Sequence, residues 1–96
     1  VYKRQEKYRK YANRIYYLTN CNLNLAGIVI ENRRKYNVDH IFPIAKGFEL
    51  DIPVELMSSL DNLQIMEYTL NNEKGSKITE IPSAILDYLV EHDIYI

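Results

Sequence analysis

Cysteine is almost missing from this sequence, which contains only Cys21. The chain alone can therefore form neither an internal disulfide nor a zinc site built from several thiolates. Long hydrophobic runs are also missing: no stretch approaches the ~18 consecutive apolar residues that a membrane-spanning helix needs, and no charged-then-apolar signal sequence opens the chain. We therefore expect a soluble cytoplasmic protein that does not engage a membrane.

Lysine and arginine are absent from residue 80 onward, where four acidic side chains give the C-terminal segment a local net charge of −4. The N-terminal segment is the reverse, because residues 3–14 carry six basic side chains against the single acid Glu6, a local net charge of +5. A solvated helix face explains such a basic run in many proteins. A second basic cluster, Arg33-Arg34-Lys35, favours contacts with the phosphates of a nucleic acid.

The sequence shows no internal repeat, no low-complexity tract and no linker that would separate two domains. Its 96 residues, 47% hydrophobic and 26% charged, have the composition of an ordinary globular protein. A chain of this length forms one core that is large enough to fold alone. We expect a single domain over residues 1–96.

The first half of the chain predicts a helix followed by a strand. Residues 3–18 form an amphipathic helix, and residues 20–24 are polar and turn-prone. Residues 25–30 are a short apolar segment that suits a strand or a buried helix end equally well. Residues 36–41 form a strand, which Pro43 stops because proline cannot continue a sheet ladder. The apolar stripe predicted for the first helix consists of Tyr8, Tyr11, Ala12, Ile15 and Leu18.

The second half predicts a loop, a short helix, a strand and two further helices. Gly47 marks the loop, and Pro53 sets the start of a helix over residues 54–57. Residues 63–68 form the second strand. Thr69 is then a plausible cap for the next helix, and Pro82 and Ser83 open the last one. The third predicted helix carries Asn71, Lys74 and Lys77, and the last one has the apolar stripe Ile85, Leu86, Leu89 and Val90.

The pair Asp39-His40, at the end of the first predicted strand, is the chemically most informative part of the chain. Two asparagines, Asn62 and Asn71, follow it. Together these residues offer an oxygen ligand for a hard cation, an imidazole that titrates near neutral pH and amide groups for a scaffold. An Asp-His pair alone is usually a surface turn or a hydrogen-bonded core histidine. The ordered set predicts a metal-dependent nuclease site.

Residues 36–77 resemble the HNH endonucleases, also called ββα-metal or His-Me finger nucleases. The resemblance rests on Asp39-His40 with Ile41 and Pro43 after it, on Gly47, on Asn62-Leu63-Gln64 entering the second strand, and on Asn71-x-x-Lys74-Gly75. The stretches Gly47-Phe48 and Ile52-Pro53-Val54-Glu55 resemble in particular the HNH proteins of phages and mobile elements. The resemblance implies an α+β fold with a small ββα-metal core, here flanked by N-terminal and C-terminal helices. It also implies that the protein acts in a bacterial or phage-infected host cell.

The resemblance also implies a role for each matching residue. His40 corresponds to the general base that takes a proton from the attacking water, while Asp39 and Asn71 correspond to ligands of one Mg²⁺ or Mn²⁺ ion. Asn62 corresponds to a structural asparagine that holds the base in position. Lys74 could contact a phosphate near the scissile bond. This interpretation requires that the segments converge around a single cation and that the ring of His40 stays free to accept a proton. A ring buried in the interior, or a carboxylate of Asp39 far from the amide of Asn71, would overturn it.

DNA is the expected partner, and RNA is not excluded. The residues expected to bind its phosphates are Arg33, Arg34, Lys35, Lys74 and Lys77. Tyrosines on the basic helix could touch nucleic acid as well, although packing in the core explains them equally well. They are Tyr8, Tyr11, Tyr16 and Tyr17.

Many HNH domains carry two cysteine pairs that bind a structural zinc, whereas Glu67 and Leu70 precede Asn71 in this chain. We therefore expect a variant without structural zinc, whose small core is covered by the flanking helices. Glu67 is an alternative further metal ligand, although a carboxylate at a strand end is more often solvated. His92 lies in an acidic segment without comparable partners, and we expect it to be exposed.

The expected function is hydrolysis of DNA phosphodiester bonds by an HNH endonuclease that uses one divalent cation. Two alternatives remain at this point. One is a nucleic-acid-binding module that has kept the fold without catalysis, relying on the basic segments. The other is a toxin-type nuclease domain that pairs with an immunity protein. The sequence does not specify the target site or the oligomeric state.

Overall fold

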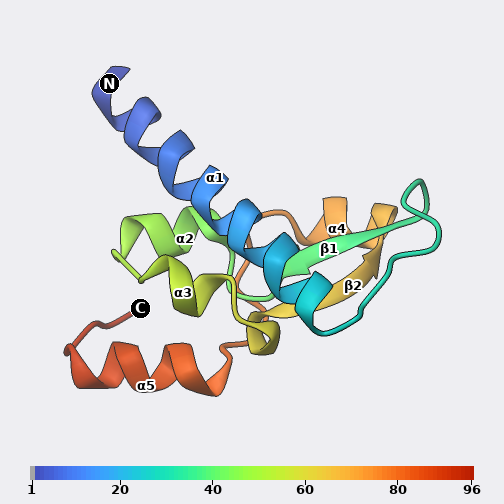
Figure 1. Cartoon of the computed structure of the whole chain (residues 1–96). Coiled ribbons are helices and arrows are strands. Elements are labelled where there is room, and N and C mark those ends of the chain that lie inside the picture. The colour runs from blue at the N-terminus through green and yellow to red at the C-terminus, as the bar shows by residue number, and fades with distance from the viewer. Residues whose placement is uncertain (1) are drawn as a thin grey trace.

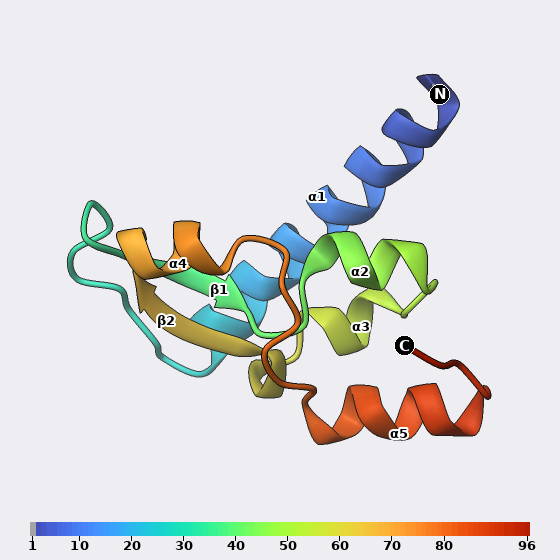
Figure 2. The same ribbon diagram turned by 180° about the vertical axis from the view of Figure 1, so that it is seen from behind.

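The computed structural model describes residues 2–96, which form an α+β fold with a two-stranded antiparallel sheet (Figure 1). A long helix at the N-terminus crosses the molecule, and its first half projects away from the body (Figures 1 and 2). The elements in chain order are α1 (Tyr2–Leu25), β1 (Tyr36–His40), α2 (Ile44–Glu49), α3 (Val54–Met57), the 3₁₀ turn η1 (Leu60–Asn62), β2 (Leu63–Glu67), α4 (Tyr68–Lys74) and α5 (Ser83–Glu91).

The two strands pair over their full length, with Asp39 opposite Gln64 and His40 opposite Leu63. The predicted strands, residues 36–41 and 63–68, are confirmed to within one residue at their C-terminal ends. Helix α4 starts directly after β2 and packs on the hairpin. This arrangement brings the end of β1 and the side chains of α4 together, although they are far apart in the sequence.

Helix α1 is longer than predicted, because residues 20–24, expected to form a turn, continue the helix to Leu25. Tertiary contacts outweigh the poor helix propensity of asparagine here. Thr19 and Leu23 are buried on the side of α1 that faces the molecule, and the side-chain amide of Asn22 donates a hydrogen bond to the carbonyl oxygen of Ser58 (2.8 Å). The apolar segment after Leu25 is neither strand nor buried helix, since the chain turns at Gly27 with a φ of +70°.

The hydrophobic core lies between α1, α2, α3 and α5. It consists of Ala12, Ile15, Phe42, Ile44, Ile52, Met57, Ile85 and Leu89. The predicted stripe of the last helix is therefore only half correct. Leu86 and Val90 are 46% and 70% exposed, because α5 covers the core with one narrow face.

The prediction of a loop at Gly47 is wrong, because this glycine is buried inside α2. A Cβ atom at position 47 would lie 2.7 Å from both Cε and Sδ of Met57 and 2.7 Å from the hydroxyl oxygen of Tyr11. Glycine is therefore favoured here by the close approach of the Met57 and Tyr11 side chains and not by a turn.

Two predictions about α4 are also wrong. The helix ends at Lys74, because Gly75 takes a φ of +53°, a backbone conformation that glycine adopts without steric cost. Lys77 therefore lies beyond the helix. Thr69 sits inside the first turn instead of capping it, and its hydroxyl donates a hydrogen bond to the carboxylate of Glu67.

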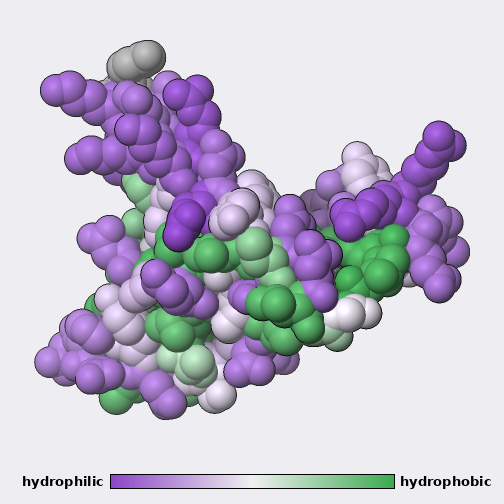
Figure 3. Space-filling view, viewed as in Figure 1, coloured by the Kyte–Doolittle hydropathy of each residue, from purple (hydrophilic) through white to green (hydrophobic). Residues whose placement is uncertain are grey.

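The projecting half of α1 presents a hydrophilic surface (Figure 3). Its six basic side chains are all exposed, so the positive charge of this segment is available to solvent and to ligands. They are Lys3, Arg4, Lys7, Arg9, Lys10 and Arg14. Within residues 2–96, no helix combines the length and the apolar character that crossing a bilayer demands.

Candidate active site

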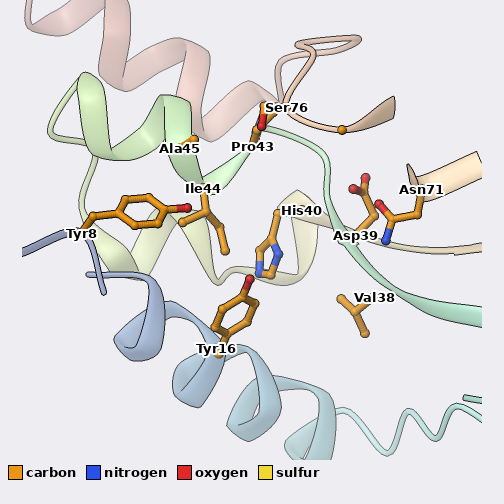
Figure 4. A pocket seen from close by; sticks show the side chains of 11 residues that line it. Tyr8, Tyr16, Val38, Asp39, His40, Pro43, Ile44, Ala45, Asn71 and Ser76 are labelled. Carbon is orange, nitrogen blue, oxygen red and sulfur yellow. The ribbon is translucent and has the colours of Figure 1, made fainter. Parts of the chain in front are cut away.

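A pocket of about 210 Å³ opens where α1, the end of β1, the start of α2 and the end of α4 meet (Figure 4). Asp39, His40 and Asn71, predicted from the sequence to act together, all line it. Tyr8 and Tyr16 of α1 form the opposite wall. The structure thus brings the predicted ligands and the predicted base to one cavity.

The Asp39 carboxylate is buried and held by two neighbours. Gln64, its partner across the hairpin, donates a hydrogen bond from Nε2 to Oδ2 (2.8 Å). The ammonium of Lys74 lies 3.3 Å from Oδ2 and 3.3 Å from Oδ1. The same ammonium donates a hydrogen bond to the carbonyl oxygen of His40 (3.1 Å). Lys74 therefore points into the protein, and contact with a phosphate would require this ammonium to leave the pair.

His40 ends β1, and only 8% of its surface is exposed. Most of the ring is therefore buried, against the expectation of a free ring, and only the part that lines the pocket can meet a substrate. Its Nε2 lies 3.0 Å from the hydroxyl of Thr19, and the ring of Tyr16 meets the imidazole edge-on at 5.9 Å between centroids. Within residues 2–96, no hydrogen bond reaches Nδ1. Every fully buried polar side-chain atom in this part of the chain has a hydrogen-bond partner, so Nδ1, which has none, is not fully buried. Nδ1 is therefore the ring nitrogen that remains accessible to the pocket.

The electrostatic surroundings of His40 favour its neutral form. Burial lowers the pKa of the imidazole from its ordinary value of 6.5 to about 4, because the charged ring would lose its hydration. The carboxylate of Asp39 opposes this change, and the ammonium of Lys74 adds to it. At neutral pH the ring is unprotonated at one nitrogen and able to accept a proton.

Asn62 is completely buried and connects the chain after His40 to the end of α3. Its Oδ1 accepts a hydrogen bond from the backbone N–H of Phe42 (2.7 Å). Its Nδ2 donates to the carbonyl oxygens of Met57 (2.8 Å) and Phe42 (3.3 Å), and its own carbonyl oxygen accepts from the N–H of Ile41 (2.8 Å). One side chain thus fixes the direction in which the backbone leaves β1.

Asn71 lies next to Asp39 in the pocket (Figure 4). Its Nδ2 donates a hydrogen bond to Oδ1 of Asn37 (2.7 Å), so the amide is oriented and its own oxygen is left for another partner. A carboxylate oxygen and an amide oxygen are the hard donors that Mg²⁺ and Mn²⁺ accept. The part of the chain described here holds no group of three or more histidine, cysteine or acidic side chains suited to a metal. The donor set fits a cation that keeps several waters.

Glu67, the alternative ligand, is not brought to this pocket. It pairs with Tyr36 at the opposite end of the hairpin from His40, and its carboxylate accepts the hydrogen bond from Thr69.

The predicted phosphate-binding residues are spread over different places. The cluster Arg33-Arg34-Lys35 is exposed and precedes Tyr36, so about 13 Å of strand separates it from His40. Lys77 is exposed and directly follows Ser76, which lines the pocket. Of the exposed basic residues predicted to bind phosphates, Lys77 is therefore the one that is nearest in the chain to a residue of the cavity wall.

Sequence reasoning missed the role of Thr19, which contacts His40 from a position 21 residues earlier in the chain. The signal was available, because Thr19 continues the buried stripe of Ala12 and Ile15 at helical spacing and Leu23 extends it. The stripe predicted from the sequence ended at Leu18. The tyrosines divide as well: Tyr8 and Tyr16 line the pocket, whereas Tyr11 donates a hydrogen bond to the carbonyl oxygen of Ile52 (2.7 Å).

Comparison of the chain with protein-family models, curated proteins and solved structures finds no match. The functional interpretation therefore depends on the residues and geometry described above.

Proposed function

We propose that this protein is a metal-dependent endonuclease, similar to HNH enzymes, that hydrolyses phosphodiester bonds in DNA. The observation that supports this function is the placement of a neutral imidazole, a carboxylate and an amide oxygen on one pocket. These groups belong to His40, Asp39 and Asn71. The resemblance to HNH enzymes supports the further proposal that it acts in the cytoplasm of a bacterial or phage-infected cell.

In this proposal, Nδ1 of His40 accepts the proton of the water that attacks the phosphorus. The oxygens of Asp39 and Asn71 would hold the cation, and Gln64 keeps the carboxylate oriented. Bound Mg²⁺ or Mn²⁺ supplies stabilisation of the negative charge that develops on the phosphate and on the departing 3′ oxygen. Asn62 keeps the end of β1 in place, so that the imidazole stays directed at the pocket.

The surroundings of the pocket favour a polyanionic substrate. Exposed lysines and arginines cover the projecting half of α1, and the exposed Lys77 directly follows Ser76 of the cavity wall. A second pocket, of about 410 Å³, shares Tyr8 and Ala45 with the first and is also lined by Arg4 and Phe48. A polymer that reaches His40 can therefore contact basic and aromatic side chains on either side of the site.

Cleavage of supercoiled plasmid DNA tests this function. We expect nicking or linearisation with Mg²⁺ or Mn²⁺ and none in EDTA. Because a positioned general base typically contributes about 100-fold or more, His40→Ala should lower the rate by at least that factor. His92→Ala is the matched control, since His92 is the other histidine, is exposed, and stacks on Tyr88 away from the pocket. Equal cutting by His40→Ala and the parent protein would refute the role of His40.

A second candidate function is a nucleic-acid-binding module without catalysis. It is favoured by the buried pair of Lys74 with Asp39, which already neutralises the carboxylate, and by the small exposed fraction of His40. This function predicts DNA binding that weakens steeply with salt concentration, without cleavage in any divalent cation. Binding and cleavage measured on the same preparation distinguish the two functions.

A further inference from the structure

The imidazole of His40 is held by a residue of α1 that lies outside the segment resembling HNH enzymes. The hydroxyl of Thr19, which is buried, lies 3.0 Å from Nε2 of His40. It is the only side-chain hydrogen bond to the ring within residues 2–96. Tyr16, one turn earlier on α1, contributes an edge-on aromatic contact, which packs against the imidazole without fixing its protons (Figure 4).

The orientation of this hydrogen bond determines which ring nitrogen can act as a base. A neutral imidazole carries one proton, so a free Nδ1 requires that Nε2–H donates to the threonine oxygen. The hydroxyl can accept in this way, because it has two lone pairs. Within residues 2–96 the Thr19 hydroxyl makes no second hydrogen bond, so no other donor competes with the ring for its lone pairs.

We propose that Thr19 is the positioning residue of His40: its hydroxyl accepts the Nε2–H hydrogen bond, fixes the tautomer and keeps Nδ1 free towards the pocket. The effect of Thr19 on catalysis rests on the proposed nuclease function, whereas its effect on the tautomer of His40 does not. Helix α1 is then part of the active site as well as a cover for the core. The closing experiment is therefore divided into a spectroscopic part and a kinetic part.

Nitrogen-15 NMR of the metal-free protein, recorded in EDTA at neutral pH, shows directly which ring nitrogen of His40 carries the proton. In the parent protein we expect the proton of His40 on Nε2, in a low-field signal that exchanges slowly with water. Thr19→Ser should keep this signal, because it keeps the hydroxyl. Thr19→Val preserves the shape but removes the acceptor, so the Nε2–H signal should move upfield and exchange faster. His92 serves as the internal reference, since it lies outside the pocket.

Two spectroscopic results would overturn the proposal. One is a parent spectrum with the proton on Nδ1, which needs no variant and so remains decisive if Thr19→Val fails to fold. The other is a folded Thr19→Val protein whose His40 signals match those of the parent. Thermal unfolding followed by circular dichroism establishes that each variant is folded.

The kinetic part measures plasmid cleavage by the same proteins. We expect Thr19→Val to lower kcat by about tenfold or more with KM near the parental value, as for other residues that orient a reactive group, and Thr19→Ser to recover most of the rate. A parental kcat in folded Thr19→Val would overturn the catalytic part. Absence of cleavage by the parent protein would instead refute the proposed function and leave the spectroscopic result to decide the role of Thr19.

Discussion

The ammonium of Lys74 lies 3.3 Å from both carboxylate oxygens of Asp39 and 3.1 Å from the carbonyl oxygen of His40. Both charged side chains are nearly buried, with 5% and 7% of their surfaces exposed. The contact ties α4 to the end of β1 at the site itself. It also compensates a carboxylate that would otherwise be an isolated buried charge.

Replacing Lys74 by methionine should therefore destabilise the metal-free protein. Loss of one partner from a buried ion pair typically costs about 3–5 kcal/mol, which we expect as a decrease in the free energy of unfolding in EDTA. A divalent cation at Asp39 takes over the missing positive charge, so Mn²⁺ should restore more stability to Lys74→Met than it adds to the parent. Urea unfolding with and without Mn²⁺ measures both effects.

The matched control is Lys46→Met, because Lys46 forms an exposed pair with Glu49 at 3.5 Å. Exposed pairs contribute at most about 1 kcal/mol, so this variant should stay close to the parent under both conditions. An equal response to Mn²⁺ in Lys74→Met and the parent would contradict the placement of the cation at Asp39.

The substitution Asn62→Asp tests the hydrogen-bond donor of this side chain independently of its acceptor. The aspartate keeps an oxygen for the N–H of Phe42 but loses the donor to the carbonyls of Met57 and Phe42. Because the site is fully buried, we expect a loss of about 2–3 kcal/mol in stability. Cleavage should fall with near-normal affinity for Mn²⁺, measured by calorimetry.

Asn72→Asp makes the same chemical change at an exposed position of α4 and serves as the control. Strong loss of Mn²⁺ binding in Asn62→Asp, with normal binding in Asn72→Asp, would contradict the scaffold role and indicate that Asn62 is a ligand.

Gly47→Ala should destabilise the fold through overlap and not through backbone strain. The added Cβ would lie 2.7 Å from atoms of Met57 and Tyr11, which must move, and overpacking of a core typically costs about 1–3 kcal/mol. Gly27→Ala is the comparison, because a Cβ there meets nothing within 4 Å and only the φ of +70° opposes it, at about 1 kcal/mol. Thermal unfolding shows which of the two variants loses more stability. A smaller loss in Gly47→Ala than in Gly27→Ala would refute the steric explanation.

Because the Tyr11 hydroxyl is partly buried, we expect the protein to lose stability at alkaline pH. Burial raises the pKa of its hydroxyl above the ordinary value of 10.0, so the folded state favours the protonated phenol. The stabilisation is complete below pH 10, where the unfolded chain is also protonated, and decreases as pH rises above 10. Tyr11→Phe removes this dependence and the hydrogen bond to Ile52, at about 1 kcal/mol below pH 10.

Urea unfolding between pH 8 and 11 tests this prediction. The difference in unfolding free energy between the parent and Tyr11→Phe should shrink as pH rises, because lysine titration affects both proteins alike. A constant difference over this range would show that the Tyr11 hydroxyl is not coupled to folding.

The strands and their order could be predicted because their signals are local. Alternation of apolar and polar residues, with Pro43 and the Asn62 segment as boundaries, places β1 and β2 to within one residue. The helix over residues 54–57 and the start of α5 at Ser83 follow from the preceding prolines in the same way. The grouping of Asp39, His40 and Asn71 on one pocket was also expected from the order of these residues.

The errors have a common physical origin in packing between distant segments. Asn22 stays helical and bonds to Ser58, and Gly47 lies inside α2, where Met57 and Tyr11 pack closely against it. Local propensity predicts a turn at both positions, and contacts made only in the folded chain override it. Leu86 and Val90 are exposed for the related reason that the width of a buried helix face depends on its neighbours.

The amino-acid sequence by itself determined which groups are available and in what order: a carboxylate, an imidazole and two amides in a small α+β chain with a basic N-terminal segment. Only the tertiary structure decided how these groups are engaged. It directs Lys74 inward to Asp39, leaves the amide oxygen of Asn71 beside that carboxylate, and sets Thr19 of α1 against His40. These contacts join residues 21–35 positions apart, and their geometry depends on how helices and hairpin pack, which no local pattern specifies.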